Sequence, residues 1–190
     1  MNTSAGEIEM AQIAKGDRIG QLTLPDINGS EFNIESVHGK RFLLSFYRFA
    51  SCPFCNLRIN KLVTKYDELP DDFELVAIFD SPLDNLQRFT EGHHAPFPIL
   101  ADEANTYYRR FGVQRSLLGV LKGAVLRMPT VMYAMFGKGY IPWVIKGSMT
   151  TMPLDILVDE NGIVQSAYYG KDEGDHMPFD QVKEFAEAGS

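Results

Sequence analysis

The sequence predicts an α/β domain in which a sheet lies between layers of helices. Two short apolar runs, residues 42–47 and 73–79, have the length and composition of buried strands. Each is followed by apolar residues at helical spacing, and residues 97–100 are a third strand candidate. Strands that alternate with helices imply right-handed crossovers and a largely parallel sheet, with helices on both faces.

The chain enters this sheet through an N-terminal arm and a hairpin. Residues 1–15 form the arm, to which we assign no function. Residues 22–34 alternate apolar and polar side chains around a turn that contains Asn28 and Gly29, the pair most typical of a tight hairpin.

The most informative stretch joins the strand at residues 42–47 to a helix. Ser51 is a good N-cap, and Pro53 stands in the first turn, where a missing N–H group costs nothing. Cys55, Ile59 and Leu62 then recur at helical spacing. Cys52 is therefore predicted to lie at the N-terminus of a helix, at the carboxyl end of a strand, where ligand chemistry is found in such sheets.

This position favours the thiolate form of Cys52. Helix N-termini and Cys-X-X-Cys motifs lower the pKa of a cysteine from roughly 8.5 to between roughly 3.5 and 7.5. Cys55, one turn further into the helix, is suited to attack a mixed disulfide formed on Cys52. We therefore predict that Cys52 is the nucleophile and Cys55 the resolving thiol.

Two structural alternatives compete with the interpretation of Cys52 and Cys55 as a redox pair. A zinc site needs four ligands, but the chain has only two cysteines, and its four histidines lack the usual zinc-binding spacing. A chance pair of core cysteines would not explain why strand, turn, motif and helix occur together. We expect neither a metal nor another cofactor.

The remaining elements follow in order. Residues 80–82 begin a helix, residues 105–111 form a short one, residues 153–169 form a hairpin about Asn161-Gly162, and residues 178–188 form the last helix. Residues 113–150 are a helical insertion, with Leu117, Leu118, Leu121 and Val125 at helical spacing and five of the eight methionines in and just after it. We expect a helical pair that covers one face of the sheet; the alternative is an adaptable surface that docks a substrate or a second subunit.

Composition places further bounds on the chain. A length of 190 residues suits a single domain. The net charge of -7 argues against nucleic acid or an anionic membrane as the main partner. The N-terminus does not have the pattern of a secretory signal, and a lone cysteine pair suits a reducing compartment, so we expect the cytoplasm.

These residues together resemble the thioredoxin-fold superfamily, specifically the peroxiredoxin-like group related to alkyl hydroperoxide reductase C and thiol-specific antioxidant proteins. The resemblance covers roughly residues 16–170, and its marks are the early hairpin, the Cys-Pro-Phe-Cys motif and Met152-Pro153 ahead of a strand. It implies a three-layer sandwich around a mixed sheet, with Cys52 as nucleophile and Cys55 as resolver. It also implies that Pro153 is a cis-proline facing the cysteines, so that Met152 and Pro153 bind an extended substrate.

The sequence also departs from that group. Typical peroxiredoxins have Thr or Ser three residues before the nucleophile and Arg near the start of the late strand; Phe49 and Pro153 stand there. Arg48 or Arg58 could supply positive charge near Cys52 instead. Of the other polar residues, we expect His93 and His94 to be a solvated loop pair.

The replacement of the usual peroxide-binding residues by Phe49 and Pro153 determines which activity we predict first. We expect a dithiol/disulfide oxidoreductase first, a thiol peroxidase that passes through a Cys52 sulfenate second, and a non-catalytic redox sensor third. The expected partners are a disulfide or peroxide substrate and a thioredoxin- or glutathione-type reductant, with a homodimer as a further possibility.

Overall fold

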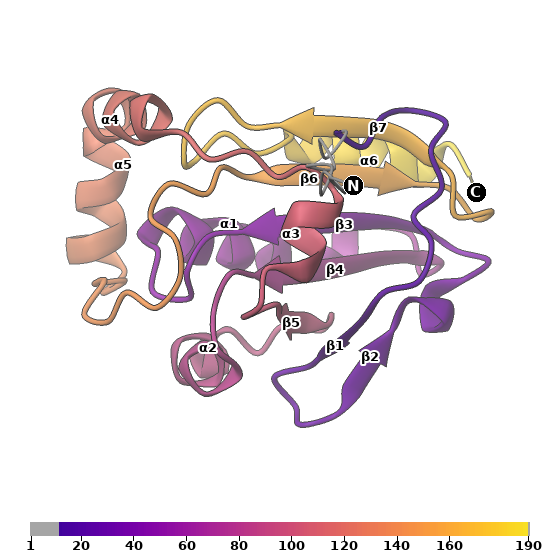
Figure 1. The fold of residues 1–190 in the computed structure, drawn as a ribbon, viewed down its shortest axis with the longest axis horizontal. Coiled ribbons are helices and arrows are strands. Elements are labelled where there is room, and N and C mark those ends of the chain that lie inside the picture. Colours follow the sequence, from indigo (N-terminus) through magenta and orange to yellow (C-terminus); the bar gives the residue numbers. More distant parts are fainter. Residues whose placement is uncertain (1–11, 190) are drawn as a thin grey trace, which may run out of the picture.

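The computed structural model describes residues 12–189, and its centre is a five-stranded mixed sheet (Figure 1). The strand order is β5-β4-β3-β6-β7. The bounds are β3 (Arg41–Tyr47), β4 (Phe73–Phe79), β5 (Ile99–Ala101), β6 (Leu154–Val158) and β7 (Val164–Tyr169). Strands β3, β4 and β5 run parallel, whereas β6 is antiparallel to both β3 and β7. The predicted α/β class and mixed sheet are confirmed.

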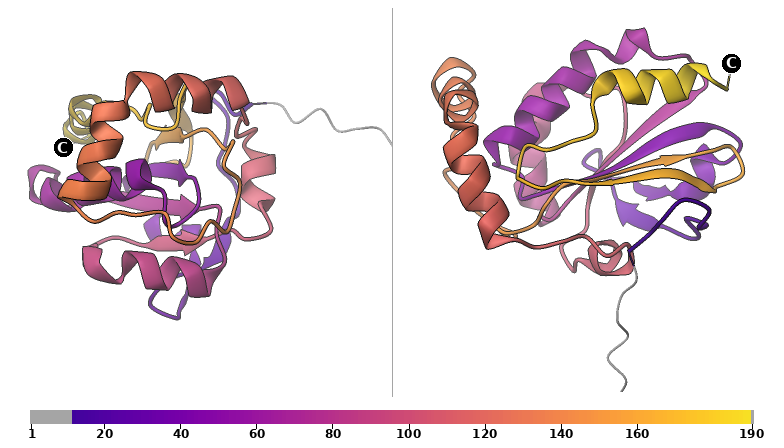
Figure 2. Two further views of the ribbon diagram at one scale, coloured as in Figure 1. Left: turned by 90° about the vertical axis from the view of Figure 1, so that its left-hand side faces the viewer. Right: turned by 90° about the horizontal axis from the view of Figure 1, so that it is seen from above.

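Two layers cover the sheet (Figure 2, right). Helices α1 (Pro53–Thr64) and α6 (Phe179–Glu187) lie on one face, and α2 (Leu83–Thr90) packs near β5 on the same side. The other face is covered by the hairpin of β1 (Thr23–Pro25) and β2 (Glu31–Asn33) and by the short helix α3 (Thr106–Arg110). Shorter helical turns connect these elements at Ile34–Val37, Tyr66–Glu68 and Glu91–His93.

Strand β3 shows why the sheet is buried on both sides. Leu43 and Tyr47 point into the core beneath α1, while Leu44 and Phe46 point into the core beneath the hairpin. This alternation follows from the two-residue period of a strand, and it requires a continuous apolar run when both faces are covered. The turn that carries the cysteines therefore starts from a strand buried on both faces.

The insertion does not cover a sheet face as we expected. It consists of α4 (Leu117–Leu126), α5 (Met128–Met132) and a π-helical turn (Tyr133–Gly137), and it projects beyond the end of the sheet beside α1 (Figure 2). The reason is that α4 turns Gly119 and Gly123, not its leucines, toward the domain. Of the N-terminal arm, residues 1–11 lie outside the described residues.

Candidate active site

The candidate site is the turn between β3 and α1. Helix α1 begins at Pro53, and its N-cap is Cys52 in extended backbone conformation, not Ser51 as the sequence suggested. The reason is that a proline at the first helical position pushes the residue before it out of the helical region. The Ser51 hydroxyl instead donates a 2.6 Å hydrogen bond to the carbonyl of Val144, which ties the insertion to this turn.

The two cysteines are free thiols with no exposed surface. Burial alone raises the pKa of Cys52, but a hydrogen bond from the Cys55 thiol, the charge of Arg48 and the amides of Cys55 and Phe54 lower it to about 6. Burial and the adjacent Cys52 sulfur both raise the pKa of Cys55. Near neutral pH the pair therefore holds one thiolate, on Cys52, and one thiol.

Arg48 is the cation of this site. Its side chain is buried, its Nη1 lies 3.7 Å from Cys52 Sγ, and its Nη2 donates to the backbone carbonyl of Met149 in the insertion. The guanidinium also lies over the ring of Phe49, 5.2 Å from its centroid. These contacts hold a permanent positive charge against the thiolate.

Arg58, the other predicted cation, serves a different group. Its Nη2 lies 4.0 Å from Asp155 Oδ2, and both side chains are buried. Asp155 also accepts from the Ser45 hydroxyl, from the Met177 N–H at 2.7 Å and from His176 Nδ1 at 3.1 Å. Burial raises the pKa of Asp155, but His176, Arg58 and Ser45 lower it to about 2. The carboxylate is therefore a fixed negative charge inside the core.

A second polar chain supports the cysteine turn from α1. The amide of Asn56 donates to the carbonyls of Ala50 and Cys52 at 2.8 and 2.9 Å, and its oxygen lies 2.7 Å from His93 Nε2. Since an amide oxygen only accepts, this contact assigns the proton to Nε2 of His93. His93 is buried, which lowers its pKa, whereas His94 is exposed. The expectation of a solvated histidine pair is therefore wrong for His93.

Comparison with known proteins decides the family. The model of the AhpC/TSA family matches residues 15–167. The chain belongs to the AhpC/TSA family. Among its relatives, Peroxiredoxin Bcp of Escherichia coli (strain K12) is 30% identical over 113 residues, which are 58% of this chain and 72% of that protein. Peroxiredoxin Q, chloroplastic, of Gentiana triflora is 26% identical over 114 residues, which are 60% of this chain and 52% of that protein.

Solved structures share the fold of this AhpC/TSA chain. Peroxidoxin BcpB from Mycobacterium tuberculosis superposes with a TM-score of 0.68 and 19% identity, covering 93% of this chain and 98% of that one. A secreted disulfide oxidoreductase of Mycobacterium tuberculosis, homologous to E. coli DsbE, gives a TM-score of 0.52 and 17% identity, covering 88% and 96%. Together with the family, the adjacent thiolate and thiol make this chain a peroxiredoxin-like thiol-dependent oxidoreductase.

One expectation taken from the wider superfamily is wrong. The Met152–Pro153 bond is not cis, since every peptide bond in the described residues is trans. The segment instead leads into β6: Met152 N–H donates to the Gln114 carbonyl at 2.8 Å, and the Pro153 carbonyl accepts from Gly170 N–H at 2.9 Å. Met152 and Pro153 are also buried. Their role in substrate binding stays a prediction, but the exposed backbone that motivated it is missing.

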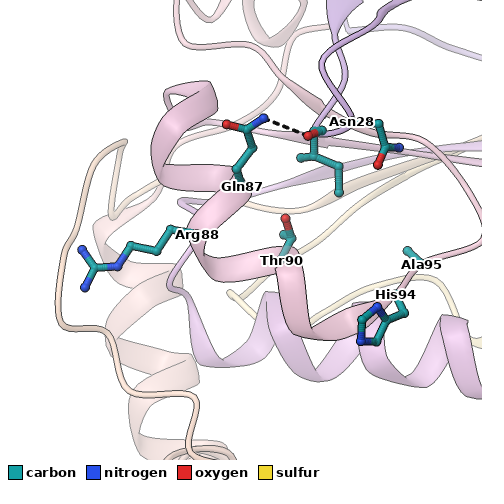
Figure 3. A pocket seen from close by; sticks show the side chains of 7 residues that line it. Asn28, Gln87, Arg88, Thr90, His94 and Ala95 are labelled. Atoms are coloured by element: carbon teal, nitrogen blue, oxygen red, sulfur yellow. Dashed lines mark hydrogen bonds between the residues drawn. The ribbon is translucent and has the colours of Figure 1, made fainter.

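One surface pocket is separate from the cysteine turn. It is lined by residues of α2 and the loop after it, including Gln87, Thr90 and His94, with Asn28 of the β1–β2 turn (Figure 3). The amide of Gln87 donates a 2.8 Å hydrogen bond to the carbonyl of Ile27 across it. The lining includes neither cysteine, and we assign no role in the redox chemistry to it.

Several residues that shape the site were missed from the sequence. Asp155 and Ser45 each interrupt a run of apolar residues in a buried strand, and that interruption was a usable signal. Asn56 follows the Cys-Pro-Phe-Cys motif directly, but nothing in the sequence connects it to His93. That partnership depends on how the loop after α2 folds back on α1.

Proposed function

We propose that the protein is a thiol peroxidase that reduces hydrogen peroxide or an organic hydroperoxide through Cys52. The observation that carries the proposal is the contact between Arg48 and the Cys52 sulfur. A peroxidase needs an activated thiolate and a positive group at the place where negative charge develops in the transition state. The peroxiredoxin relatives add support from a separate source.

The chemistry runs in two steps on this chain. The Cys52 thiolate attacks one peroxide oxygen, so that an S–O bond forms, the O–O bond breaks, and the other oxygen takes up a proton and leaves as water or alcohol. Cys52 is oxidised to a sulfenic acid, and the peroxide is reduced. The Cys55 thiol then attacks the Cys52 sulfur, which forms the disulfide and releases water.

Arg48 fits the first step for two reasons. Its charge stabilises the attacking thiolate, as the lowered pKa of Cys52 reflects. The same charge faces the oxygen that becomes negative as the O–O bond breaks, because the peroxide must approach the sulfur beside it. Arg48 thereby supplies positive charge that Phe49 and Pro153 cannot supply.

These features reverse our initial ranking of the two enzymatic activities. The sequence favours disulfide exchange because Phe49 and Pro153 replace peroxide-binding side chains and because a cis-proline groove is expected. Arg48 supplies the missing positive charge, and the Met152–Pro153 bond is trans and buried. Dithiol exchange remains compatible with the Cys52–Cys55 pair as the step that regenerates the enzyme. We propose a dithiol donor of thioredoxin type as the reductant, and the cytoplasm as a compartment that supplies it.

Rapid mixing tests this function. Reduced protein is mixed separately with hydrogen peroxide, an organic hydroperoxide and a protein disulfide, and the loss of free thiols is followed. We expect either peroxide to react well above the rate of a free thiolate and faster than the disulfide, and Cys52→Ser to abolish that reaction. A peroxide rate no higher than that of a free thiolate, with fast disulfide exchange, would instead support the oxidoreductase.

A separate measurement distinguishes the enzyme from a redox sensor. Both would form the sulfenic acid and then the disulfide, but only an enzyme is reduced again quickly enough to turn over. Steady-state peroxide consumption with a thioredoxin system should continue through many cycles in wild type and stop after one in Cys55→Ser. A single turnover in wild type would point to the sensor.

A further inference from the structure

Helix α4 has its small and large side chains on unexpected sides. Gly119 and Gly123 face the domain: a Cβ on Gly119 would lie 2.7 Å from Met152 Sδ, and one on Gly123 would collide with the Glu173 carboxylate. The opposite side, which faces solvent, carries Leu117, Leu118, Leu121 and Val125. In a surface helix of a water-soluble domain the large apolar side chains face the core. The glycines thus allow close docking of α4 while its leucines stay outside.

This exposure is concentrated in the insertion. All twelve exposed large hydrophobic side chains of the described residues lie between positions 117 and 149. They include Leu118, Phe136 and Trp143, which are 79%, 74% and 77% exposed. Scattered exposed apolar residues are normal, but a gathering of this size marks a surface that contacts something apolar. We name residues 117–149 the apolar face.

The segment that carries the exposed apolar side chains is also rich in basic residues. Residues 104–154 contain seven Lys or Arg and no Asp or Glu, so all 25 acidic residues of the chain lie elsewhere. Lys122 and Lys138 are exposed, and neither forms an ion pair within the described residues. The net charge of -7 therefore conceals a basic segment within an acidic protein. Of the four cations between residues 117 and 149, Arg127 and Lys146 are paired with Asp172 and Asp84. The positive charge that a partner meets at this face is therefore that of Lys122 and Lys138, because salt screens charges beyond about 8–10 Å.

The shape of the helical pair indicates how it would meet a bilayer. No single described helix is long and apolar enough to cross a membrane; α4 and Met128–Gly137 pass that test only together, with a bend of 78° between them. A ten-residue helix is about 15 Å long, half of the roughly 30 Å hydrocarbon core. A bent pair of this kind suits a position in the interface, with leucines and aromatics among the acyl chains and lysines at the headgroups.

We propose that the apolar face docks on the surface of an anionic lipid bilayer without crossing it. This departs from the expectation drawn from net charge, because the acidic residues lie outside the docking segment. A second copy of the chain fits less well as the partner. A symmetric contact would bring the apolar face of one copy, with its lysines, against the same face of the other, and residues 117–149 contain no acidic residue to pair with those lysines. The proposal does not depend on which substrate Cys52 reduces.

The test is vesicle co-sedimentation of the reduced full-length protein. Vesicles of phosphatidylcholine alone are compared with vesicles in which a third of the lipid is phosphatidylglycerol, at physiological salt. We expect binding to the anionic vesicles to be about tenfold or more stronger, and the fluorescence of Trp143, the single tryptophan, to shift to the blue. If the protein binds neither kind of vesicle, or if the Trp143 spectrum is unchanged, the proposal is wrong.

Charge variants supply the matched control. The double variant Lys122→Glu/Lys138→Glu should lose about tenfold or more in binding to anionic vesicles, whereas Lys61→Glu, an exposed lysine on α1, should bind like wild type. Leu118→Ser/Leu121→Ser should lose binding while it keeps its thermal unfolding midpoint. If this apolar variant instead converts a dimer to a monomer in sedimentation equilibrium, and wild type ignores vesicles, the face is a contact between copies and the membrane proposal is wrong.

Discussion

The cysteine turn and the apolar face lie side by side, and they depart from ordinary burial in opposite directions. The turn and the elements packed around it bury Arg48, Arg58 and Asp155, groups that most domains keep in water. The apolar face instead exposes leucines that most domains bury. Hydrogen bonds from Ser51 to Val144 and from Arg48 to Met149 join the two regions. The departures therefore meet at one end of the sheet.

The buried charges around the cysteine turn and the exposed apolar side chains of α4 serve different purposes. Inside, each charge has a specific partner, so that the structure holds Cys52 as a thiolate and Asp155 as a carboxylate. Outside, the large side chains of α4 are in solvent. We therefore expect them to contribute little to folding, in keeping with the proposal that they act in contacts beyond the chain. Substitutions in the two regions should accordingly affect different properties.

The largest effect on stability should come from the buried carboxylate. Asp155→Asn should cost about 3–5 kcal/mol in urea denaturation at pH 7, because Arg58 then loses its buried counter-charge. Asp71→Asn, at an exposed position, should stay within about 0.5 kcal/mol of wild type.

The pH dependence of Asp155 has a defined sign. Its folded pKa is about 2, below the ordinary 3.8, so its stabilising contribution is complete above the unfolded pKa and is lost as pH falls through the folded value. Between about pH 5 and pH 1, the free energy of unfolding of wild type should therefore fall by about 2–3 kcal/mol more than that of Asp155→Asn. Parallel acid profiles for the two proteins would contradict this account of the buried network.

A pair of leucine substitutions tests the contrast directly. Leu44→Ala in β3 should lower the free energy of unfolding by about 2–5 kcal/mol, since it opens a cavity in the core. Leu118→Ala in α4 should change it by less than about 0.5 kcal/mol, because that side chain is already in solvent. A large loss for Leu118→Ala would show that the apolar face supports the fold.

Replacing the cation should slow the first chemical step. Arg48→Met should raise the pKa of Cys52 by about one to three units and lower the rate of peroxide oxidation on the order of a hundredfold. Arg48→Lys should recover part of both effects because it restores the charge, and Arg88→Met on exposed α2 should react like wild type. Stopped-flow rates across pH for the three variants supply the measurement.

The last pair of variants separates the two roles of Cys55. Cys55→Ala should raise the pKa of Cys52 at least as much as Arg48→Met does, because the hydrogen bond from the Cys55 thiol lowers that pKa more than the charge of Arg48. Cys55→Ser should raise it less, since its hydroxyl still donates, although neither variant can form the disulfide. Thiolate absorbance in the ultraviolet, followed against pH, distinguishes them; equal pKa values in both variants and wild type would exclude this hydrogen bond.

The fold was largely predictable because its signals are local. The strand at Phe73–Phe79 and the turn at Asn161-Gly162 follow from apolar runs and turn chemistry, and the structure has both. The cysteine pair could be found in the same way, because strand, proline and helix fix its position along the chain.

What could not be predicted depends on contacts distant in sequence. The position of Arg48 depends on the Met149 carbonyl, 101 residues away. The outward direction of α4 was hidden because exposed leucines have the same helical period as core leucines, and only Gly119 and Gly123 marked the docking side. The cis bond was carried over from a resemblance at Pro153, where the structure has a trans bond immediately before β6 begins.

The most direct test of the central claim is the pH dependence of peroxide oxidation at Cys52 in the Cys55→Ser variant. Mass spectrometry reads the sulfenic acid after trapping, and stopped-flow gives its rate. We predict that the oxidised residue is Cys52 and that the rate follows a single ionisation well below that of a free cysteine, near pH 6 or slightly above, with a plateau beyond it. A rate that keeps rising toward the pKa of a free cysteine, roughly 8.5, would contradict the claim that Arg48 and the first turn of α1 activate this thiol.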